Sequence, residues 1–212
     1  MSMRIALRTA ILSVLLAPAV AASQTGETVQ WWKAGDKTTY TIFVNGKTQE
    51  LTETWTSATD TSITGIQKIG SREVPLALAL PYQEVARMCL SDGEECHFSP
   101  GIKSLDLPLE KGKKWSTTFN AESANFTAEV TEDYQVEKSE KVTVPAGAFD
   151  ATKIAFTGRI KGTNKKGERF TGKEDGTYWV AFIAGRPVTV KTTYRNSFGA
   201  RTNRELVSTS LN

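Results

Sequence analysis

Apolar and polar residues alternate with a period of two along most of the chain beyond residue 28, and this period is typical of half-buried β-strands. Tyr40, Ile42 and Val44 alternate with Thr39, Thr41 and Phe43. A second extended run follows through Trp55, although Glu53 interrupts its apolar side. Asn45-Gly46 separates these two runs and predicts a hairpin, because both residues tolerate the positive φ of a tight turn. Further alternating runs cover 119–136, 142–144, 151–161, 170–182, 188–194 and 201–211.

Most of the breaks between these runs are short and contain Gly, in places with Pro or Asn, which are typical turn residues. Connections of this length join antiparallel neighbours but are too short for the crossovers of parallel sheets. The sequence therefore predicts an all-β fold, an antiparallel meander that forms a strongly curved sheet or an open barrel. Core positions are expected at Phe43, Trp55, Phe119, Phe126, Ile154, Phe156, Val180, Phe182, Val188 and Val190.

One segment departs from the alternation. Residues 76–88 are rich in helix formers, and Pro81 suits the first turn of a short helix, although a strand fits nearly as well. We expect a short irregular or helical insertion around 76–101. It is not interpreted as a domain boundary, because neither half of the chain is expected to close a sheet alone, so 25–212 is predicted to be a single β domain.

The first residues contain the three parts of a secretory signal peptide. Arg4 and Arg8 supply the positive region, residues 10–20 are apolar, and Ala19-Val20-Ala21 offers the small residues that signal peptidase reads. We expect residues 1–21 to be removed by cleavage after Ala21 or Ala22, which places the mature protein in the periplasm or outside the cell. The apolar run is too short for a membrane anchor, which needs roughly 20 residues.

Charge and composition indicate which classes of partner the protein is not expected to bind. Loss of Arg4 and Arg8 with the signal peptide lowers the formal net charge from +3 to +1. The remaining lysine runs, 111–114 and 164–166, are short and lie beside turns, so they indicate solvated tips and no nucleic-acid partner. No later stretch is apolar enough to span a membrane. The protein is expected to be a monomer.

The stretch from Met88 to Phe98 holds both cysteines of the chain, its only histidine and three carboxylates. Cys89 and Cys96 are expected to form a disulfide, because the export signal directs the chain to a compartment where disulfides persist. The bond would close a short loop, for which the loss of unfolded-chain entropy gives about 2.5 kcal/mol of stabilisation. A metal site that adds His97 and a carboxylate such as Asp92 is an alternative, although zinc ligands usually come in separated pairs. A redox pair is another, although its usual motif is Cys-x-x-Cys.

Motifs for enzyme chemistry are absent from the sequence, so no enzyme and no cofactor are expected. Any Ser-His-Asp or Cys-His arrangement would have to use His97, and no phosphate-binding loop, nucleophile elbow or zinc-protease motif occurs. A carboxylate-based envelope hydrolase is the less favoured alternative, since two carboxyl groups suffice for glycoside hydrolysis. The carboxylates that could approach each other in a sheet are Glu122, Glu129, Glu132, Asp133, Glu174 and Asp175.

Several aromatic residues stand singly in or beside the β runs. Most are expected to pack inside the sheet, because tryptophan is highly buried on average. Some could instead line a cavity for a lipid or another apolar ligand, since curved sheets and barrels often hold one. The residues considered for this role are Trp55, Trp115, Tyr178 and Trp179.

The segment 141–154 contains Val144-Pro145-Ala146-Gly147-Ala148-Phe149-Asp150 between two β runs. Pro145 fixes φ, Gly147 permits the turn and Phe149 can fold back onto the core. This pattern resembles the signature of the exported bacterial DUF3108-like proteins, which are of unknown function, and the late strand Tyr178-Trp179-Val180 departs from the Trp-Tyr-Ala-Pro of that family. The resemblance implies a strongly curved antiparallel β protein, similar in outline to periplasmic lipoprotein carriers, and brings no catalytic residues.

Together these observations predict an exported, non-enzymatic β protein that holds an apolar ligand or an envelope partner on a concave sheet. The alternative is an interaction or structural module of the cell envelope without a small ligand. Such a module would use edge strands or the loop 89–96 to meet its partner.

Overall fold

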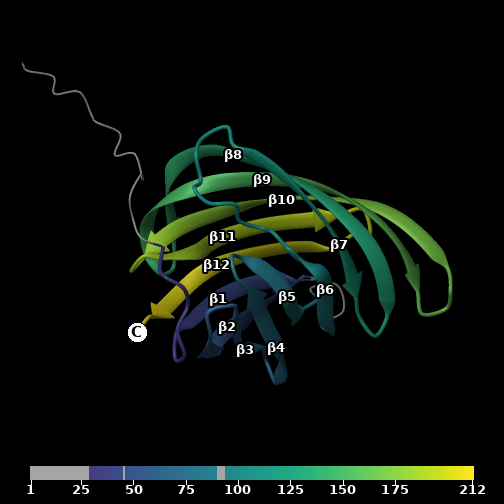
Figure 1. The fold of residues 1–212 in the computed structure, drawn as a ribbon, viewed down its shortest axis with the longest axis horizontal. Helices are drawn as coiled ribbons and strands as arrows, with labels where there is room; N and C mark the ends of the chain where they lie inside the picture. The colour runs from purple at the N-terminus through teal and green to yellow at the C-terminus, as the bar shows by residue number, and fades with distance from the viewer. Residues whose placement is uncertain (1–28, 45, 90–93) are drawn as a thin grey trace, which may run out of the picture.

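The computed structural model describes residues 29–44, 46–89 and 94–212, and this part of the chain forms one closed antiparallel barrel (Figure 1). Its strands are β1 (Lys37–Val44), β2 (Lys47–Ala58), β3 (Ser62–Ile69), β4 (Arg72–Ala79), β5 (Gln83–Met88), β6 (Glu95–Ile102), β7 (Lys114–Glu122), β8 (Phe126–Val144), β9 (Gly147–Asn164), β10 (Arg169–Ile183), β11 (Arg186–Asn196) and β12 (Arg201–Ser210). Each strand pairs with the next along the chain, and β1 also pairs with β12. The antiparallel meander is confirmed, and its sheet is closed.

The barrel is asymmetric because its strands differ in length. β8, β9 and β10 contain 19, 18 and 15 residues, whereas β3 to β6 contain between 6 and 8. Register shifts between Val136 and Lys138 and between Trp179 and Val180 mark β-bulges in the long strands, and bulges increase local bend and twist. In Figure 1 the long green strands accordingly arch over the short blue ones and enclose the interior.

The interior face follows from the period-two pattern. On β8 every second residue from Ala128 to Val136 is buried, while Glu129, Asp133 and Gln135 between them are exposed, because successive side chains of a strand point to opposite faces. The buried apolar side chains form three clusters, centred on Tyr40, Leu51 and Trp55, on Phe98 and Phe119, and on Tyr134 and Phe156.

The segment 76–101 is not a helical or irregular insertion. It contributes the second half of β4, all of β5 and most of β6 to the barrel wall, with Leu76 and Leu78 alternating into the interior. Helix propensity is a weak preference that strand pairing and burial override here. Pro75 is tolerated because β4 pairs with β5 only from Ala77 onward, so its missing N–H leaves no gap in that ladder.

Most of the expected core positions are buried, and one expectation is wrong. Phe43 is 40% exposed, because the inward positions of β1 are Tyr40 and Ile42 and the alternation turns residue 43 outward. Phe126 and Phe182 are half-buried. The buried ones are Trp55, Phe119, Ile154, Phe156, Val180, Val188 and Val190.

The two predicted turns are present. β1 pairs with β2 up to Val44↔Lys47, and Gly46 has a φ of 80° in the connection; Asn45 lies outside the described residues. Val144 pairs with Gly147 across a two-residue turn that contains Pro145, and the half-buried Phe149 packs against the first core cluster. The expected signal peptide, residues 1–21, also lies outside the described part of the chain.

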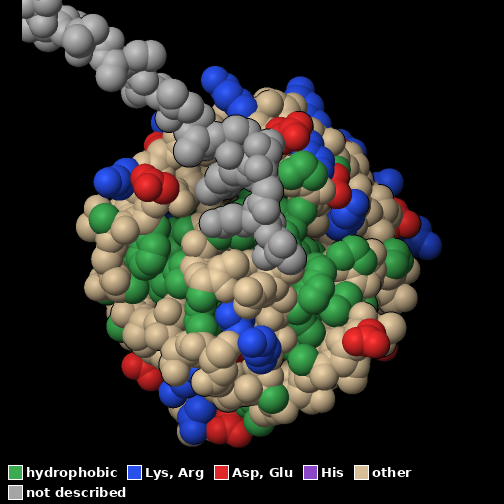
Figure 2. All heavy atoms as spheres, turned by 60° about the vertical axis from the view of Figure 1, so that its left-hand side comes forward, with side chains coloured by type: hydrophobic (Ala, Val, Ile, Leu, Met, Phe, Trp, Pro, Cys, Tyr) green, Lys and Arg blue, Asp and Glu red, His purple; other side chains and the backbone are tan. Residues whose placement is uncertain are grey.

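Figure 2 views the end of the barrel that carries the C-terminus. Hydrophobic side chains gather toward the middle of this face, with a few Lys or Arg side chains among them, and most charged side chains lie near its edge. Half-buried Trp31, Leu80, Ile183 and Leu211 pack against the first core cluster. No helix among the described residues has the length and apolar character needed to cross a bilayer.

Candidate functional site

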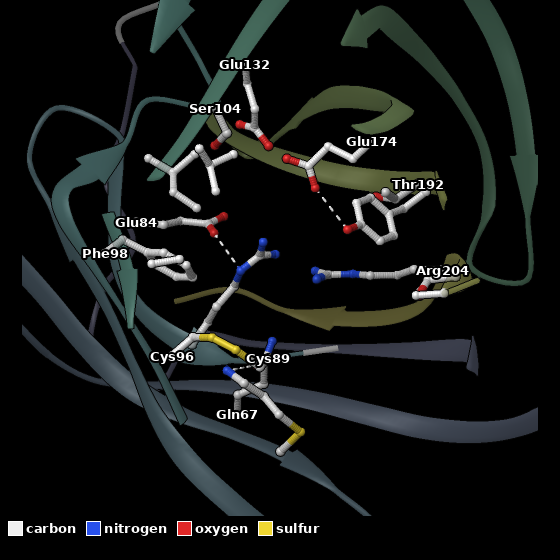
Figure 3. A pocket seen from close by; sticks show the side chains of 18 of the residues that line it. Gln67, Glu84, Cys89, Cys96, Phe98, Ser104, Glu132, Glu174, Thr192 and Arg204 are labelled. Carbon is white, nitrogen blue, oxygen red and sulfur yellow. Dashed lines mark hydrogen bonds and ion pairs between the residues drawn. A yellow bond between two sulfur atoms is a disulfide. The ribbon is translucent and has the colours of Figure 1, made fainter. Parts of the chain in front are cut away.

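A cavity of about 720 Å³ lies inside the barrel, and each of the twelve strands contributes at least one side chain to its wall. This volume is within the roughly 300–1,000 Å³ of typical small-molecule sites. Figure 3 shows Glu132 and Glu174 pointing into the cavity from one wall, across from Gln67 and the two cysteines, with Arg204 reaching in from the side. The wall divides into an apolar part and a part that carries charged side chains. The latter, called the charged belt, consists of Glu53, Glu84, Arg87, Glu132, Glu174 and Arg204.

The apolar part is built by β6 to β9. Phe98 and Phe119 meet edge to face with their ring centroids 5.7 Å apart, and Val130 and Ile160 lie in the same buried cluster. These four side chains line the cavity. The second cluster thus surrounds free space and gives that space a hydrocarbon-like wall.

An aromatic row follows at the loop ends of the long strands. Phe170 packs edge to face against Phe126 and Phe198, at 6.4 and 5.5 Å between ring centroids. All three rings belong to the cavity wall, and Phe198 is 52% exposed, so the row runs from the interior to the surface. This row makes the rim of the cavity apolar.

The charged belt contains an ion pair between the buried Glu53 of β2 and the half-buried Arg204 of β12. Nη1 and Nη2 of Arg204 lie 3.0 Å from Oε1 and Oε2 of Glu53, a bidentate geometry that strengthens the pair. Thr38 and Gln67 also donate hydrogen bonds to Glu53, at 3.2 and 3.0 Å. The Arg204 guanidinium lies over the Tyr40 ring, 3.5 Å from its centroid. This part of the belt is held rigidly by its neighbours.

A second ion pair joins Glu84 and Arg87 on β5, with Arg87 Nε 3.3 Å from Glu84 Oε2. Residues three apart on a regular strand point to opposite faces. A register shift between Glu84 and Ala86 adds the extra residue that brings both side chains to the interior. Arg87 keeps 32% of its side-chain surface accessible because it borders the cavity.

Glu132 and Glu174 form a pair across three strands. Both register with Gly158 of β9, one from β8 and one from β10, and both are buried. A methyl group on residue 158 would lie 2.7 Å from Cγ and Oε1 of Glu174 and 3.2 Å from Cγ of Glu132. Glycine therefore leaves the space in which the two carboxyl groups meet and hydrogen-bond each other.

The paired carboxyl groups retain a proton. Burial, together with the negative charge of Glu174, raises the pKa of Glu132 to about 8. Burial also raises the pKa of Glu174, against hydrogen bonds that favour its charged form. Tyr134 donates its hydroxyl hydrogen bond to Glu132 Oε2, and Tyr194 donates to Glu174 Oε2 at 2.9 Å. The pair can share a proton while two hydroxyl donors stabilise the charge that remains.

This pair should make the stability of the protein depend on pH. The folded protein holds a proton on Glu132 up to about pH 8, whereas the unfolded chain releases it near pH 4.5. The free energy of unfolding should therefore fall by about a few kcal/mol as the pH rises from 4.5 to about 8, and should level off above pH 8. Glu132→Gln should flatten this slope in urea unfolding measured at pH 5, 6.5 and 8.

Glu129→Gln is the matched control, because Glu129 lies on the exposed face of the same strand. It should retain the slope of the unmodified protein. An equal slope in Glu132→Gln and in the control would show that another group causes the pH dependence.

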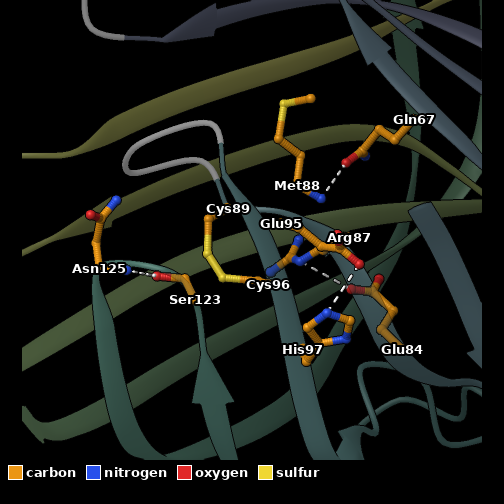
Figure 4. Close-up of a disulfide and its surroundings, with 10 residues drawn as sticks. All are labelled: Gln67, Glu84, Arg87, Met88, Cys89, Glu95, Cys96, His97, Ser123 and Asn125. Atoms are coloured by element: carbon orange, nitrogen blue, oxygen red, sulfur yellow. Dashed lines mark hydrogen bonds and ion pairs between the residues drawn. A yellow bond between two sulfur atoms is a disulfide. The ribbon is translucent and has the colours of Figure 1, made fainter. Parts of the chain in front are cut away.

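Cys89 and Cys96 lie at disulfide distance, with their Cα atoms 5.3 Å apart, and Figure 4 shows the bond joining the end of β5 to the start of β6. Both cysteines line the cavity. His97 turns the other way: it is 62% exposed and its Nε2 lies 3.0 Å from Glu95. The carboxylate considered for the metal alternative, Asp92, lies outside the described residues.

The aromatic residues considered as ligand-lining separate into two groups. Trp55 and Tyr178 line the cavity. Trp115 instead stacks on Tyr134, with ring centroids 5.0 Å apart, and donates a hydrogen bond to the Lys103 carbonyl. Trp179 donates to Glu140 at 2.8 Å, with the ammonium groups of Lys153 and Lys191 over its ring, and it is not part of the cavity wall.

The charged belt is not evident from the sequence. There Glu132 and Glu174 are two of several carboxylates that could approach each other in a sheet, and no sequence motif marks Glu84, Arg87 or Arg204. The usable signal was a charged residue at an inward position of an alternating run, as at Glu53, which interrupts the apolar side of β2.

No family model and no curated protein matches the chain. Among solved structures, a candidate lipoprotein from Parabacteroides distasonis is similar at 14% identity with a TM-score of 0.53, and a candidate exported protein with a YmcC-like fold from Bacteroides fragilis at 13% with 0.52. Each comparison covers 84% of this chain and 97% of the other. The hypothetical lipoprotein YmcC from Escherichia coli aligns with a TM-score of 0.46 at 8% identity, over 82% of this chain and 83% of its own. At these identities the likeness concerns the fold alone: the chain has an all-β architecture similar to that of the Parabacteroides and Bacteroides proteins.

Proposed function

We propose that this protein is an exported, non-enzymatic carrier that holds an amphiphilic, lipid-like ligand inside its barrel, in the periplasm or outside the cell. The observation that carries this proposal is the cavity of about 720 Å³, whose wall combines an apolar part with a charged belt. A ligand with a hydrocarbon chain and a polar head matches both parts. The apolar rim offers the chain a path between the surface and the interior.

The apolar part supplies affinity, and the belt fixes orientation. Each methylene group that enters an apolar site gains about 0.8 kcal/mol, so affinity should rise about fourfold for each added carbon until the cavity is full. Polar groups placed in an apolar pocket commonly determine which way a ligand lies. A chain beside Phe98 and Phe119 would leave its head at the belt.

Export is supported by the N-terminal pattern and by the cysteine pair, since disulfides persist in oxidising compartments. Two proteins of similar fold are described as a candidate lipoprotein and a candidate exported protein. The resemblance to the DUF3108-like proteins belongs to the same proposal. It rests on the turn around Pro145, which the barrel uses to join β8 and β9.

The partner-binding alternative would use either an edge strand or the loop 89–96, and the described barrel leaves no edge strand for it. A free strand edge attracts an added strand, but β1 pairs with β12, so the described barrel presents no open edge of its sheet. The hydrolase alternative gains a carboxyl pair, Glu132 with Glu174. The two groups are close enough to hydrogen-bond, however, whereas glycosidases separate their carboxyl groups by about 5–9.5 Å. We therefore place the carrier first.

Filling the apolar part should abolish ligand binding. In Val130→Trp a large ring would occupy the space beside Phe119 and Ile160, so Nile red binding should weaken by about tenfold or more. Native mass spectra of this variant purified from the cell envelope should also lose any lipid-sized adduct that the unmodified protein carries. Circular dichroism checks that the barrel still forms.

Glu129→Trp places the same ring one residue away on the exposed face of β8 and should bind Nile red like the unmodified protein. The carrier proposal fails if the unmodified protein binds no Nile red and carries no adduct. It also fails if Val130→Trp, still folded, binds as well as the control.

A further inference from the structure

A group of exposed basic side chains borders the mouth of the cavity. The mouth lies at the β9–β10 turn (165–168) and the β11–β12 turn (197–200), which Figure 1 shows on the right, away from the C-terminus. Asn164, Asn196 and Phe198 at these turns belong to the cavity wall. Five exposed cations lie on the two turns or on the strand residues that border them, and they are called the basic rim: Lys165, Lys166, Arg169, Lys173 and Arg201.

The charge of the basic rim is not neutralised locally. The segments 164–173 and 196–201 contain these five cations and one carboxylate, Glu168, which gives a formal net charge of +4. The chain carries +1 after loss of Arg4 and Arg8, so the rest of it carries −3. None of the five cations forms an ion pair within the described residues, whereas Arg195, just before the second segment, is paired with Asp175 at 2.9 Å. The positive charge is therefore concentrated at the mouth.

An exposed phenyl ring lies among these cations. Phe198 is 52% exposed, and its ring lies over Gly172, where the missing side chain leaves room for it. The N–H of Lys173 donates to Oγ of Ser197 at 2.9 Å, and the N–H of Ser197 donates to the Lys173 carbonyl at 2.8 Å. These two bonds tie the β11–β12 turn to β10 and hold the ring on the rim of the mouth, with Lys173 on one side and Arg201 three residues further on.

A bilayer that contains anionic phospholipids matches both features. Each Lys or Arg side chain close to such a surface strengthens binding by about fivefold. Aromatic rings are favoured at the level of the lipid head groups, where their apolar surface leaves water. The mouth also leads to the apolar part of the cavity, so a bilayer fits the charge of the rim and the hydrocarbon-like interior behind it.

We infer that the basic rim and Phe198 dock the barrel on an anionic phospholipid bilayer, with the mouth of the cavity facing the lipid. The inference rests on the carrier function proposed above and adds the surface at which the carrier exchanges its ligand. The phenyl ring enters the head-group layer, and the five cations lie beside lipid phosphates. An amphiphile then passes between bilayer and cavity along the aromatic row without crossing water.

Cosedimentation of the mature protein with vesicles tests the docking. One vesicle consists of phosphatidylcholine, and the other of phosphatidylcholine and phosphatidylglycerol in equal parts. The protein should bind the anionic vesicle about tenfold or more tightly than the neutral one. Raising the salt to about 1 M, where the Debye length is only about 3 Å, should remove most of this difference.

A pair of substitutions locates the docking surface. Lys173→Gln together with Arg201→Gln removes two cations of the rim and should weaken binding to the anionic vesicle by about tenfold or more. Neither residue belongs to the cavity wall, so this variant should bind Nile red like the unmodified protein. Lys37→Gln together with Lys141→Gln removes two exposed cations at the opposite end of the barrel and should leave vesicle binding unchanged.

The role of the ring is tested separately. Phe198→Ser should weaken binding to the anionic vesicle by about fivefold, because about half of the ring is free to enter the head-group layer. Ile66→Ser removes a side chain that is 42% exposed on β3 and should have no such effect. Circular dichroism checks that each variant folds. Unchanged binding by Phe198→Ser would overturn the insertion of the ring.

The outcomes separate docking from the carrier function. Equal binding to both vesicles, or equal weakening by the rim pair and the control pair, overturns the inference. If the protein binds Nile red but neither vesicle, the carrier stands, docking on lipid is overturned, and an acidic protein becomes the candidate partner of the rim. If the rim binds anionic vesicles while the protein holds neither Nile red nor a lipid-sized adduct, docking stands and the carrier function fails.

Discussion

Replacing Asp36 with alanine is expected to lower the free energy of unfolding by about 3–5 kcal/mol, the cost of breaking a buried ion pair from one side. Asp36 is fully buried and its Oδ2 lies 2.7 Å from Nε of Arg186, which is 2% exposed. Without Asp36 the guanidinium of Arg186 would remain in the interior without a counter-ion. Urea unfolding at neutral pH measures the difference.

The same carboxylate also ties three parts of the chain together. Backbone N–H groups of Lys33 and Asn212 donate to Asp36 at 2.7 Å each, and Arg186 donates to the Asn212 carbonyl. Arg186 begins β11, so the segment before β1, the β10–β11 turn and the last residue meet at one point. Asp36→Ala should therefore loosen the end of the barrel as well as lower its overall stability.

Asp175→Ala is the matched control for this prediction. Asp175 accepts from Nε of Arg195 at 2.9 Å, but this pair is 44% and 67% exposed. Exposed pairs contribute about 0–1 kcal/mol, because water screens them and holding two long side chains costs entropy. If the Asp36 and Asp175 variants lose similar stability, burial is not what makes the Asp36 pair important.

Local features of the fold were predictable from the sequence, because alternation and turn chemistry are local properties. The hairpin at Gly46 and the turn at Pro145 each depend on a few adjacent residues. Barrel closure was not predictable, because it depends on β1 meeting β12 from the far end of the chain. The composition of residues 76–88 favours a helix, and only pairing with neighbouring strands, which a local pattern does not contain, makes them β-strands.

The candidate site was predictable only in part. Trp55 and Tyr178 could be named because large aromatic residues in alternating runs tend to face the interior. The meeting of Glu132 with Glu174 requires the register of three strands over Gly158, which the sequence of any one strand does not contain. Glu84 and Arg87 share a face only because of a β-bulge, and a strict period of two separates them.

Phe156→Ala is expected to lower the free energy of unfolding by about 3–5 kcal/mol, the usual cost of deleting a buried phenyl ring. Phe156 is 3% exposed, and its ring stacks on Tyr178 and Tyr134, at 5.1 and 5.6 Å between ring centroids. The ring lies over Gly176 of β10, where a methyl group would come within 2.5 Å of it. Phe156 therefore fills space that the neighbouring strand leaves open, and chemical denaturation measures what that contact contributes.

Phe43→Ala tests the same truncation on the opposite face of the wall. Phe43 is 40% exposed, so its loss should cost less than about 1 kcal/mol. A cost below that value for Phe156 as well would mean that the stacked rings add little to stability and that the β8–β10 wall is held by its strand pairing. A large cost for Phe156 alone would assign the stability of the wall to the aromatic layer behind Glu132 and Glu174, whose hydroxyl donors Tyr134 and Tyr194 belong to the same stack.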